Sequence, residues 1–184
     1  MMAMHQDVQQ KAYDEITQLS TEDGRYTENH LTNNLKYLEQ CIKETLRMFS
    51  PVVVTSRFTH KEITLTDNLT VPANVLVVAL ILLANKDPDL YKNPQRWDPE
   101  HFSDQAIEKR SKNSQLSFGY GARTCIGSKY AMMSIKTQIA YILRNYHLST
   151  SVKELKREHL KADLSIRSRI GYPIKFTRRR EMKQ

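Results

Sequence analysis

The chain has 184 residues, of which 40% are hydrophobic and 26% are charged, and this balance excludes an intrinsically disordered protein. The 28 Lys and Arg exceed the 20 Asp and Glu, so the net charge of +8 favours an acidic partner, whether protein, lipid surface or nucleic acid. The two cysteines, Cys41 and Cys125, form no CxxC motif or Cys/His cluster, which argues against a disulfide framework or a zinc site and favours a reducing compartment.

Two amphipathic helices are predicted in the first third of the chain. The amino end, residues 1–10, has no basic region followed by an apolar run, so it does not resemble a signal peptide. A first apolar stripe predicts a helix over about residues 5–19, and its members are Val8, Ala12, Ile16 and Leu19. A stronger stripe predicts a helix over about residues 33–49, and its members are Leu35, Leu38, Ile42 and Leu46.

Short strands are predicted next, over about residues 52–79, where β-branched runs alternate with turn residues. The apolar run 75–84 predicts a buried strand that continues into a short helix, and it is too short to cross a bilayer. Residues 86–117 are polar and show little periodicity, and with the loop that follows they form an irregular stretch over about residues 86–126. Such a long irregular stretch in a compact domain is typically functional or disordered.

A third helix is predicted over about residues 127–145, with an apolar face formed by Ala131, Met132, Ile135, Ile139, Ile142 and Leu143. Two short strands are predicted within residues 162–177, before a basic tail that we expect to be frayed. The pattern as a whole predicts a mainly α fold with small β-sheets, of the α+β class.

The stretch FGYGARTCIG, residues 118–127, concentrates three of the five glycines around Cys125. Free backbone N–H groups at the start of the following helix stabilise a thiolate over a thiol. The glycines let the backbone approach a flat partner closely, and Arg123 can bind a carboxylate through two hydrogen bonds. The alternative is a buried free cysteine at a helix start.

The spacing Phe-x-x-Gly-x-Arg-x-Cys-x-Gly in this stretch resembles the haem-binding loop of the cytochrome P450 family. The resemblance implies that Cys125 is the axial thiolate ligand of haem b. In the family this thiolate favours O–O cleavage. It implies that Arg123 binds a haem propionate and that Phe118 packs against the sulfur. Gly119, Gly121 and Gly127 complete the implied cofactor-binding loop.

Three companion features occur in the order that the family has them. Glu44 and Arg47 match a Glu-x-x-Arg motif, although an i,i+3 pair of this kind is usually a solvated surface pair. Arg57 lies on the first predicted strand after that helix, where the family directs an arginine at haem. The segment WDPEHF matches the Pro-Glu-Arg-Phe motif, with His101 in place of the arginine that closes a network with Glu44 and Arg47. Histidine is expected to donate one hydrogen bond to this network, so the network is expected to be weaker.

Two further positions that usually hold glycine in the family hold Asn68 and Asn74 instead. Asparagine tolerates positive φ better than most residues, so both turns are expected to survive. The resemblance covers residues 1–184 and implies the carboxyl-terminal part of the fold, on the proximal side of haem. The stretch after Cys125 resembles animal microsomal members related to fatty-acid hydroxylases.

The implied function is a haem-thiolate monooxygenase that inserts one oxygen atom from O2 into a small apolar substrate. Electrons come from a redox partner such as a cytochrome P450 reductase, and NADPH enters only through that partner. The full-length family member is expected on the cytosolic face of the endoplasmic reticulum membrane. This chain is expected to lack the amino-terminal anchor and the oxygen-activating helix, either as a fragment or as a truncated product.

Two surfaces are implied by the same resemblance. Substrate contacts are expected at Val53, Val54 and Thr55 and in the turn 165–171, although core valines in a short strand are nearly as good an interpretation. Reductase contacts are expected at Arg110, Lys112 and Lys129, although these could equally be solvated charges without a partner. Cys41 is expected to be dispensable for haem binding.

Two alternatives to the monooxygenase remain. The first is a non-catalytic remnant that keeps the proximal fold and does not hold haem productively. The second, a basic binding module, has little support because the charges are interspersed and match no nucleic-acid motif. These 184 residues by themselves are expected to bind haem poorly, to aggregate and to show no turnover. The Glu44–Arg47 pair is then expected to be partly solvated and weak.

Overall fold

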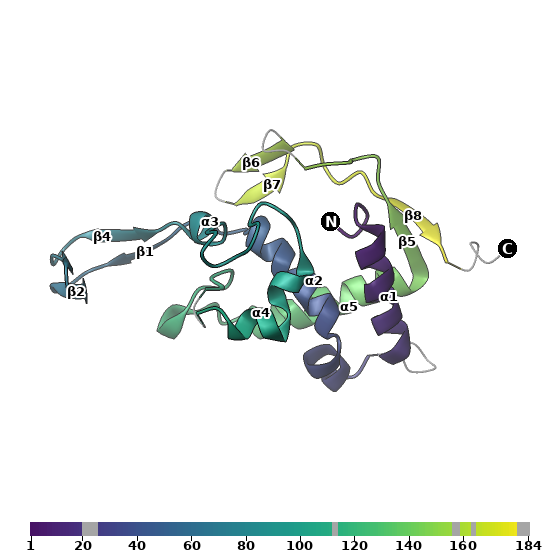
Figure 1. Cartoon of the computed structure of the whole chain (residues 1–184), viewed down its shortest axis with the longest axis horizontal. Coiled ribbons are helices and arrows are strands. Elements are labelled where there is room, and N and C mark those ends of the chain that lie inside the picture. The colour runs from purple at the N-terminus through teal and green to yellow at the C-terminus, as the bar shows by residue number, and fades with distance from the viewer. Residues whose placement is uncertain (20–25, 112–113, 156–158, 163–164, 180–184) are drawn as a thin grey trace.

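The protein is described by a computed structural model covering residues 1–19, 26–111, 114–155, 159–162 and 165–179. Three longer helices lie at its centre, and an arm of strands projects to one side (Figure 1). The longer helices are α1 (Gln6–Leu19), α2 (Lys36–Met48) and α5 (Ser128–Asn145). Shorter helical segments are η1 (His30–Asn34), α3 (Ile81–Ala84), η2 (Pro99–Phe102), α4 (Asp104–Glu108) and η3 (Gly121–Arg123). The strands are β1 (Thr55–Phe58), β2 (Ile63–Thr66), β3 (Leu69–Val71), β4 (Leu76–Ala79), β5 (Tyr146–Ser149), β6 (Leu160–Ala162), β7 (Ile166–Ser168) and β8 (Lys175–Arg178).

The hydrophobic core lies where α1, α2 and α5 pack against one another. Its fully buried members come from the predicted apolar stripes and include Ala12, Ile16, Leu35, Leu38, Ala140 and Leu143. Burial of such side chains contributes about 1.5–3 kcal/mol for each large aliphatic group. The mainly helical fold with small antiparallel sheets is therefore confirmed.

The single helix predicted over residues 33–49 is wrong at its amino end. A short π-helix, η1, ends at Asn34, and Leu35 leaves helical conformation with φ −72° and ψ 61°. α2 then begins afresh, and the Glu15 carboxylate of α1 accepts hydrogen bonds from the backbone N–H groups of Tyr37 and Leu38 at 2.8 and 2.9 Å. A carboxylate at a helix start satisfies free N–H groups and complements the helix dipole, so α1 fixes where α2 starts.

Two buried polar side chains join the helices to their neighbours. Gln9 of α1 pairs with the backbone of Leu148 in β5, donating to its carbonyl and accepting from its N–H, both at 2.8 Å. Lys136 of α5 is 2% exposed, donates to the Leu31 carbonyl at 2.7 Å and forms an ion pair with Glu39. Buried polar groups need such partners, and hydrophobic periodicity does not reveal them.

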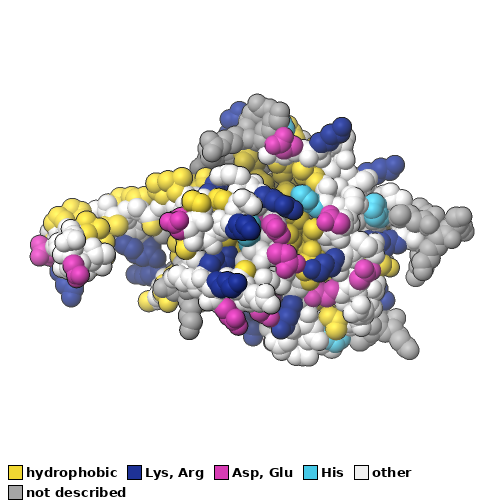
Figure 2. All heavy atoms as spheres, in the orientation of Figure 1, with side chains coloured by type: hydrophobic (Ala, Val, Ile, Leu, Met, Phe, Trp, Pro, Cys, Tyr) yellow, Lys and Arg dark blue, Asp and Glu magenta, His cyan; other side chains and the backbone are white. Residues whose placement is uncertain are grey.

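The projecting arm consists of two antiparallel pairs, β1 with β4 and β2 with β3. Leu76 and Val78 of β4 are 62% and 50% exposed, and hydrophobic side chains gather on the arm in Figure 2. The prediction that residues 75–84 begin with a buried strand is therefore wrong, although α3 follows the strand as expected. A two-stranded sheet buries little by itself, and no described element covers this side of β4.

The two asparagines at the expected glycine positions behave differently. Asn74 has φ 62°, a left-handed conformation, and its N–H donates to the Thr59 carbonyl at 2.7 Å. Asn68 is absent from the positive-φ residues of the described chain, so the turn between β2 and β3 does not depend on the tolerance of asparagine.

The carboxyl-terminal strands differ in part from the prediction. β5 follows α5 directly and pairs with β8, whereas β6 pairs with β7. β5 has the sequence YHLS, and a search for alternating apolar residues does not predict this strand because most of its residues are polar. β8 extends to Arg178, and residues 180–184 of the basic tail lie outside the described residues. Among the described residues, no helix is both long enough and apolar enough to span a membrane.

Candidate functional site

The loop of residues 118–127 is held by its own backbone. The Cys125 N–H donates to the Phe118 carbonyl at 2.8 Å, and the Thr124 N–H donates to the Gly121 carbonyl at 3.0 Å. Gly119 and Gly121 have φ values of 76° and 74°. Other L residues rarely adopt these angles, so glycine is required at both positions.

Cys125 lies directly before α5, as its sequence position predicted. Its thiol is free and exposed, and its carbonyl accepts from the N–H of Ser128, the first residue of α5, at 3.2 Å. A side chain at Gly127 would place its Cβ 3.9 Å from the Cys125 sulfur. Glycine there keeps the space beside the sulfur free. The sulfur is therefore presented to the outside of the loop, beside an accessible helix start.

The side chains around this thiol fit a flat, largely apolar cofactor that carries carboxylates. Arg123 is exposed, Ile126 is fully exposed, and Tyr130 is 78% exposed. A Cβ at Gly121 would meet no atom within 4 Å. The donor set is thus one accessible thiol and one guanidinium, which fits haem because a cysteine thiolate can ligate its iron and a guanidinium can pair with a carboxylate.

Phe118 and Arg57 have other contacts in the described part of the chain, and their roles at haem stay predictions. The backbones of Phe118 and Cys125 are in contact at 2.8 Å, and the Phe118 side chain is half-buried. Arg57 lies on β1, and its exposed guanidinium bonds to Thr55 and to the Ser56 carbonyl at 3.1 and 2.7 Å. No contact among the described residues joins Arg57 to the loop.

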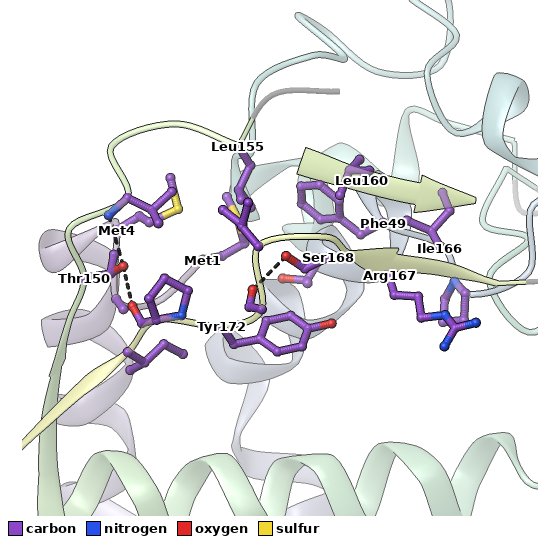
Figure 3. A pocket seen from close by; sticks show the side chains of 18 residues that line it. Met1, Met4, Phe49, Thr150, Leu155, Leu160, Ile166, Arg167, Ser168 and Tyr172 are labelled. Atoms are coloured by element: carbon purple, nitrogen blue, oxygen red, sulfur yellow. Dashed lines mark hydrogen bonds between the residues drawn. The ribbon is translucent and has the colours of Figure 1, made fainter. Parts of the chain in front are cut away.

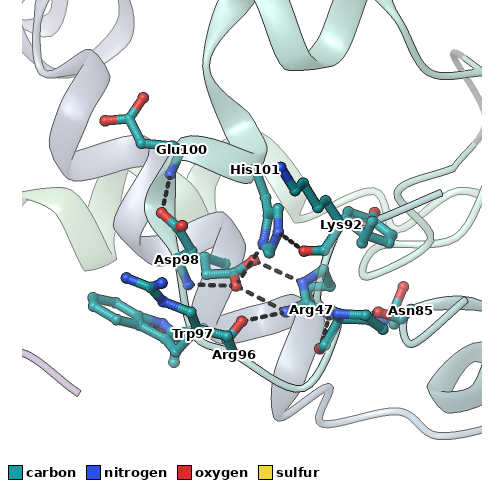
Figure 4. Close-up of polar contacts among 12 residues, drawn as sticks. Arg47, Asn85, Lys92, Arg96, Trp97, Asp98, Glu100 and His101 are labelled. Atoms are coloured by element: carbon teal, nitrogen blue, oxygen red, sulfur yellow. Dashed lines mark hydrogen bonds and ion pairs between the residues drawn. The ribbon is translucent and has the colours of Figure 1, made fainter. Parts of the chain in front are cut away.

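A buried ion-pair network joins α2 to residues 85–101 (Figure 4). Glu44 and Arg47 are both 0% exposed. The Nε and Nη2 groups of Arg47 donate to the two carboxylate oxygens of Glu44 at 2.7 and 2.8 Å. The prediction that this pair is partly solvated and weak is wrong, and so is the alternative of a solvated surface pair. The reason is that residues 85–101 wrap around both side chains.

Arg47 uses all five of its N–H donors. Besides the two bonds to Glu44, Nη1 donates to the carbonyls of Asn85 and Pro94 at 2.6 and 2.8 Å, and Nη2 donates to that of Arg96 at 3.2 Å. The ring of Tyr91 lies 4.8 Å from the guanidinium carbon. A planar guanidinium can satisfy this many acceptors at fixed angles, whereas a lysine cannot. Arg47 therefore fixes the path of the segment that leads towards the cysteine loop.

Glu44 is bonded on every side. Its Oε1 also accepts from the Asp98 N–H at 2.8 Å and contacts His101 Nδ1 at 3.1 Å. Burial would raise the pKa of Glu44, but the hydrogen bonds from Arg47, His101 and Asp98 outweigh it and hold that pKa below its usual value. The carboxylate is therefore ionised at neutral pH.

His101 makes two contacts where one was predicted. In addition to Glu44, its Nε2 lies 2.6 Å from the Lys92 carbonyl oxygen. The motif predicts the contact with Glu44 but not the one with Lys92, because the acceptor at Lys92 is a backbone atom. The backbone acceptors of Arg47 were missed for the same reason.

Of the residues expected at a substrate site, the turn 165–171 lines a cavity, whereas Val53, Val54 and Thr55 do not. The turn 165–171 lines an apolar cavity of about 350 Å³ through residues 166–168, 170 and 171 (Figure 3). Phe49 and Pro51, which follow α2, line its other side. Val53, Val54 and Thr55 are not among the lining residues. Val54 is 46% exposed, so the alternative of a core valine is wrong for that residue.

The three expected reductase contacts also differ from one another. The Arg110 guanidinium is stacked over the rings of Tyr91 and Phe102, with its carbon 4.4 and 5.0 Å from the ring centres. Arg110 is half-buried, so it is no simple solvated charge, and burial lowers its pKa. Lys129 is exposed near the start of α5, 3.7 Å from Glu28. Lys112 lies outside the described residues.

The second cysteine is unlike the first. Cys41 lies within α2, is 2% exposed and is in the buried face of the helix. Burial raises the pKa of its thiol, and the nearby Glu15 carboxylate raises it further. A protonated, enclosed thiol is a poor metal ligand, because the thiolate is the ligating form.

Comparison with known proteins decides the family. The family model for cytochrome P450 matches residues 1–173 of this chain. The chain belongs to the cytochrome P450 family. The match includes the cysteine loop, the buried ion-pair network and the projecting arm. The mixture of helices and small antiparallel sheets accords with part of the P450 fold.

Similar P450s come from insects and a plant. Cytochrome P450 4g15 of Drosophila melanogaster is 31% identical over 177 residues, which are 96% of this chain and 31% of that protein. Cytochrome P450 4c21 of Blattella germanica is 29% identical over 93% of this chain and 33% of its own length. Cytochrome P450 72A552 of Barbarea vulgaris is 36% identical over 82% and 29%. The chain thus spans about a third of the length of these curated P450s, and the animal branch stays a prediction.

Proposed function

We propose that this chain supplies the axial thiolate and the proximal haem wall of a monooxygenase that inserts one oxygen atom from O2 into a small apolar substrate. The observation that carries the proposal is the exposed Cys125 thiol between two left-handed glycines and the start of α5. Haem, when bound, activates O2, and a thiolate ligand favours O–O cleavage. The electrons come from a reductase, with NADPH acting only through it.

The residues of the loop have distinct proposed roles. Cys125 ligates the iron of haem b, and Arg123 binds a propionate, because a guanidinium matches a carboxylate. Gly119, Gly121 and Gly127 allow close approach of the backbone, and Phe118 shields the sulfur. Arg57 provides a second cation for a propionate.

The buried network has a positioning role in this proposal. Glu44, Arg47 and His101 hold residues 85–101 against α2 through the bonds given above. Because this segment leads through α4 to the cysteine loop, a fixed segment limits the positions that the loop can adopt. A preorganised loop holds the thiolate in place for haem, which lowers the cost of ordering on binding.

The apolar cavity behind the turn 165–171 is the proposed substrate side of the chain. Its lining includes Phe49, Ile166 and Ile170, so an apolar organic molecule fits its chemistry. Val53, Val54 and Thr55 lie on the adjoining segment and are proposed to contact a substrate that extends beyond the cavity. The complete protein is proposed to act on the cytosolic face of the endoplasmic reticulum membrane.

An acidic reductase is the proposed electron donor, and Lys129 is the best test of its docking surface. Lys129→Glu should slow electron delivery several-fold at low salt and weaken its salt dependence, because a like charge opposes an acidic partner. Stopped-flow reduction at several salt concentrations measures both. Lys175→Glu is the matched control, since this exposed lysine lies in β8, which pairs with the strand at the other end of α5. Equal rates for the parent and Lys129→Glu at low salt would exclude this surface.

Haem reconstitution tests the proposed function directly. Purified protein is titrated with haemin, and the stoichiometry of thiolate-ligated haem and reductase-dependent oxidation under labelled O2 are measured. We expect weak haem binding and no turnover by these 184 residues alone, because this chain provides only the proximal wall and leaves the other face of haem to water. The exposed Ile126 and Tyr130 would favour association of the haem-free chain. Binding without any thiolate signal would favour the alternative of a non-catalytic remnant. Stoichiometric thiolate ligation with turnover would make this chain a self-sufficient catalyst.

A further inference from the structure

The ring of His101 lies between two hydrogen-bond acceptors. Nδ1 is 3.1 Å from Glu44 Oε1, and Nε2 is 2.6 Å from the Lys92 carbonyl oxygen (Figure 4). A neutral imidazole carries one N–H, so it can donate to one acceptor only. A carbonyl oxygen has no proton to give. One of the two contacts is therefore unfavourable unless a second proton is present on the ring.

Glu44 cannot supply that proton. Its two oxygens already accept from Arg47, and Oε1 also accepts from the Asp98 N–H. A carboxyl group that receives this many donors is ionised, because each bond favours its charged form. Turning the His101 ring over would place carbon atoms against both acceptors. The protonation state that satisfies both contacts is the imidazolium.

We infer that His101 is held as an imidazolium and acts as a proton-dependent positioning residue that ties residues 92–101 to α2. The protonated ring donates to both the Lys92 carbonyl and Glu44, so it connects the backbone at Lys92 to the Glu44 carboxylate of α2. The neutral ring can keep one of these bonds and loses its attraction to Glu44. This inference does not depend on the proposed function, because it rests on the protein network alone.

The charges around the ring come from every element packed against it. α2 provides Glu44 and Arg47, and the preceding turn provides Asp98 and Glu100. Tyr91 packs edge-on against His101, with ring centres 5.8 Å apart, and Arg110 covers the Tyr91 ring. Beside the ring lies a cavity of about 500 Å³, whose charged lining residues are Asp89, Lys92, Arg96, Asp98, Glu100, Lys109 and Arg110. This open cavity gives protons from solvent access to the ring.

The direction of the pH dependence follows from these contacts. The hydrogen bond to Glu44 raises the pKa of His101 above 6.5, against burial, and the Lys92 carbonyl raises it further. A raised pKa means that the stabilisation is fully present below the unfolded-state value and is lost as pH rises through the folded-state value. Glu44 has a lowered pKa, so its own contribution is lost only when pH falls through that lowered value.

Two measurements on the 184-residue chain test the inference. ¹⁵N NMR of histidine-labelled protein reports whether both ring nitrogens carry protons, and the His101 signal is assigned by its loss in His101→Gln. Urea midpoints from about pH 5.5 to about pH 8.5 give the stability profile. The parent midpoint should fall as pH rises. His101→Arg should remove this fall because guanidinium stays charged. His60→Gln is the matched control, since His60 is exposed on the arm, and it should keep the fall.

Two outcomes would overturn the inference. One is a neutral His101 tautomer in the folded parent at about pH 6.5, the ordinary histidine value. The other is an unchanged alkaline fall in His101→Arg. If His101→Gln does not fold, the His101→Arg spectrum assigns the signal instead, so the NMR measurement decides without the glutamine variant.

Discussion

Replacing Cys125 with alanine should abolish the red-shifted Soret band of the ferrous carbon monoxide complex in the haem-loaded full-length protein. The shift requires a thiolate on iron, and Cys125 is the exposed thiol in the loop that fits haem. Haem affinity should also fall, because the metal–ligand bond is lost. The carbon monoxide difference spectrum measures the first effect, and a haemin titration measures the second.

Cys41→Ala is the matched control for this experiment. Cys41 is buried in α2, where burial raises the pKa of its thiol, so the spectrum should be unchanged. A small loss of stability is expected from the packing defect. The assignment of Cys125 would be contradicted by a red-shifted band that survives in Cys125→Ala, or by one that disappears in Cys41→Ala.

Arg47→Leu should lower the free energy of unfolding by about 3–5 kcal/mol, which would unfold much of a marginally stable chain. The substitution leaves the Glu44 carboxylate buried without its cation and deprives three backbone carbonyls of their donor. Urea unfolding monitored by circular dichroism measures the loss. Where the variant does not fold, its far-ultraviolet spectrum before denaturant is added already reports the result.

Lys43→Leu gives the contrasting case on the same helix. Lys43 pairs with Glu39 at 2.7 Å, with side chains 27% and 28% exposed, and Glu39 keeps its second partner, Lys136. A partly exposed pair contributes about 0–1 kcal/mol, so a loss in that range is expected. Equal effects of the two substitutions would show that Arg47 does not act as a buried anchor.

The double variant Glu44→Leu/Arg47→Leu should still be destabilised, because Asp98 and the three carbonyls lose their partners.

The sequence predicts the parts of this fold that depend on side-chain pattern. The stripes containing Ala12, Ile16, Leu38 and Leu143 place the three helices because apolar periodicity records which face is buried. The glycines of the cysteine loop were predictable too, since Gly119 and Gly121 adopt the angles that only glycine takes readily.

The parts that depend on backbone atoms or on tertiary contacts escape such patterns. The break at Leu35 depends on the Glu15 carboxylate of another helix. The burial of Arg47 depends on carbonyl groups, which every residue carries and no sequence motif marks. The exposure of β4 depends on which elements lie beside it, and its apolar residues alone predicted the opposite.

The axial ligand is the central claim, and X-ray absorption at the iron edge of the haem-loaded full-length protein measures it most directly. The account predicts a sulfur atom at bonding distance from iron in the parent and in Cys41→Ala, and its loss in Cys125→Ala. Iron surrounded by nitrogen and oxygen alone in the parent would contradict the account, because the exposed Cys125 thiol would then not be the ligand.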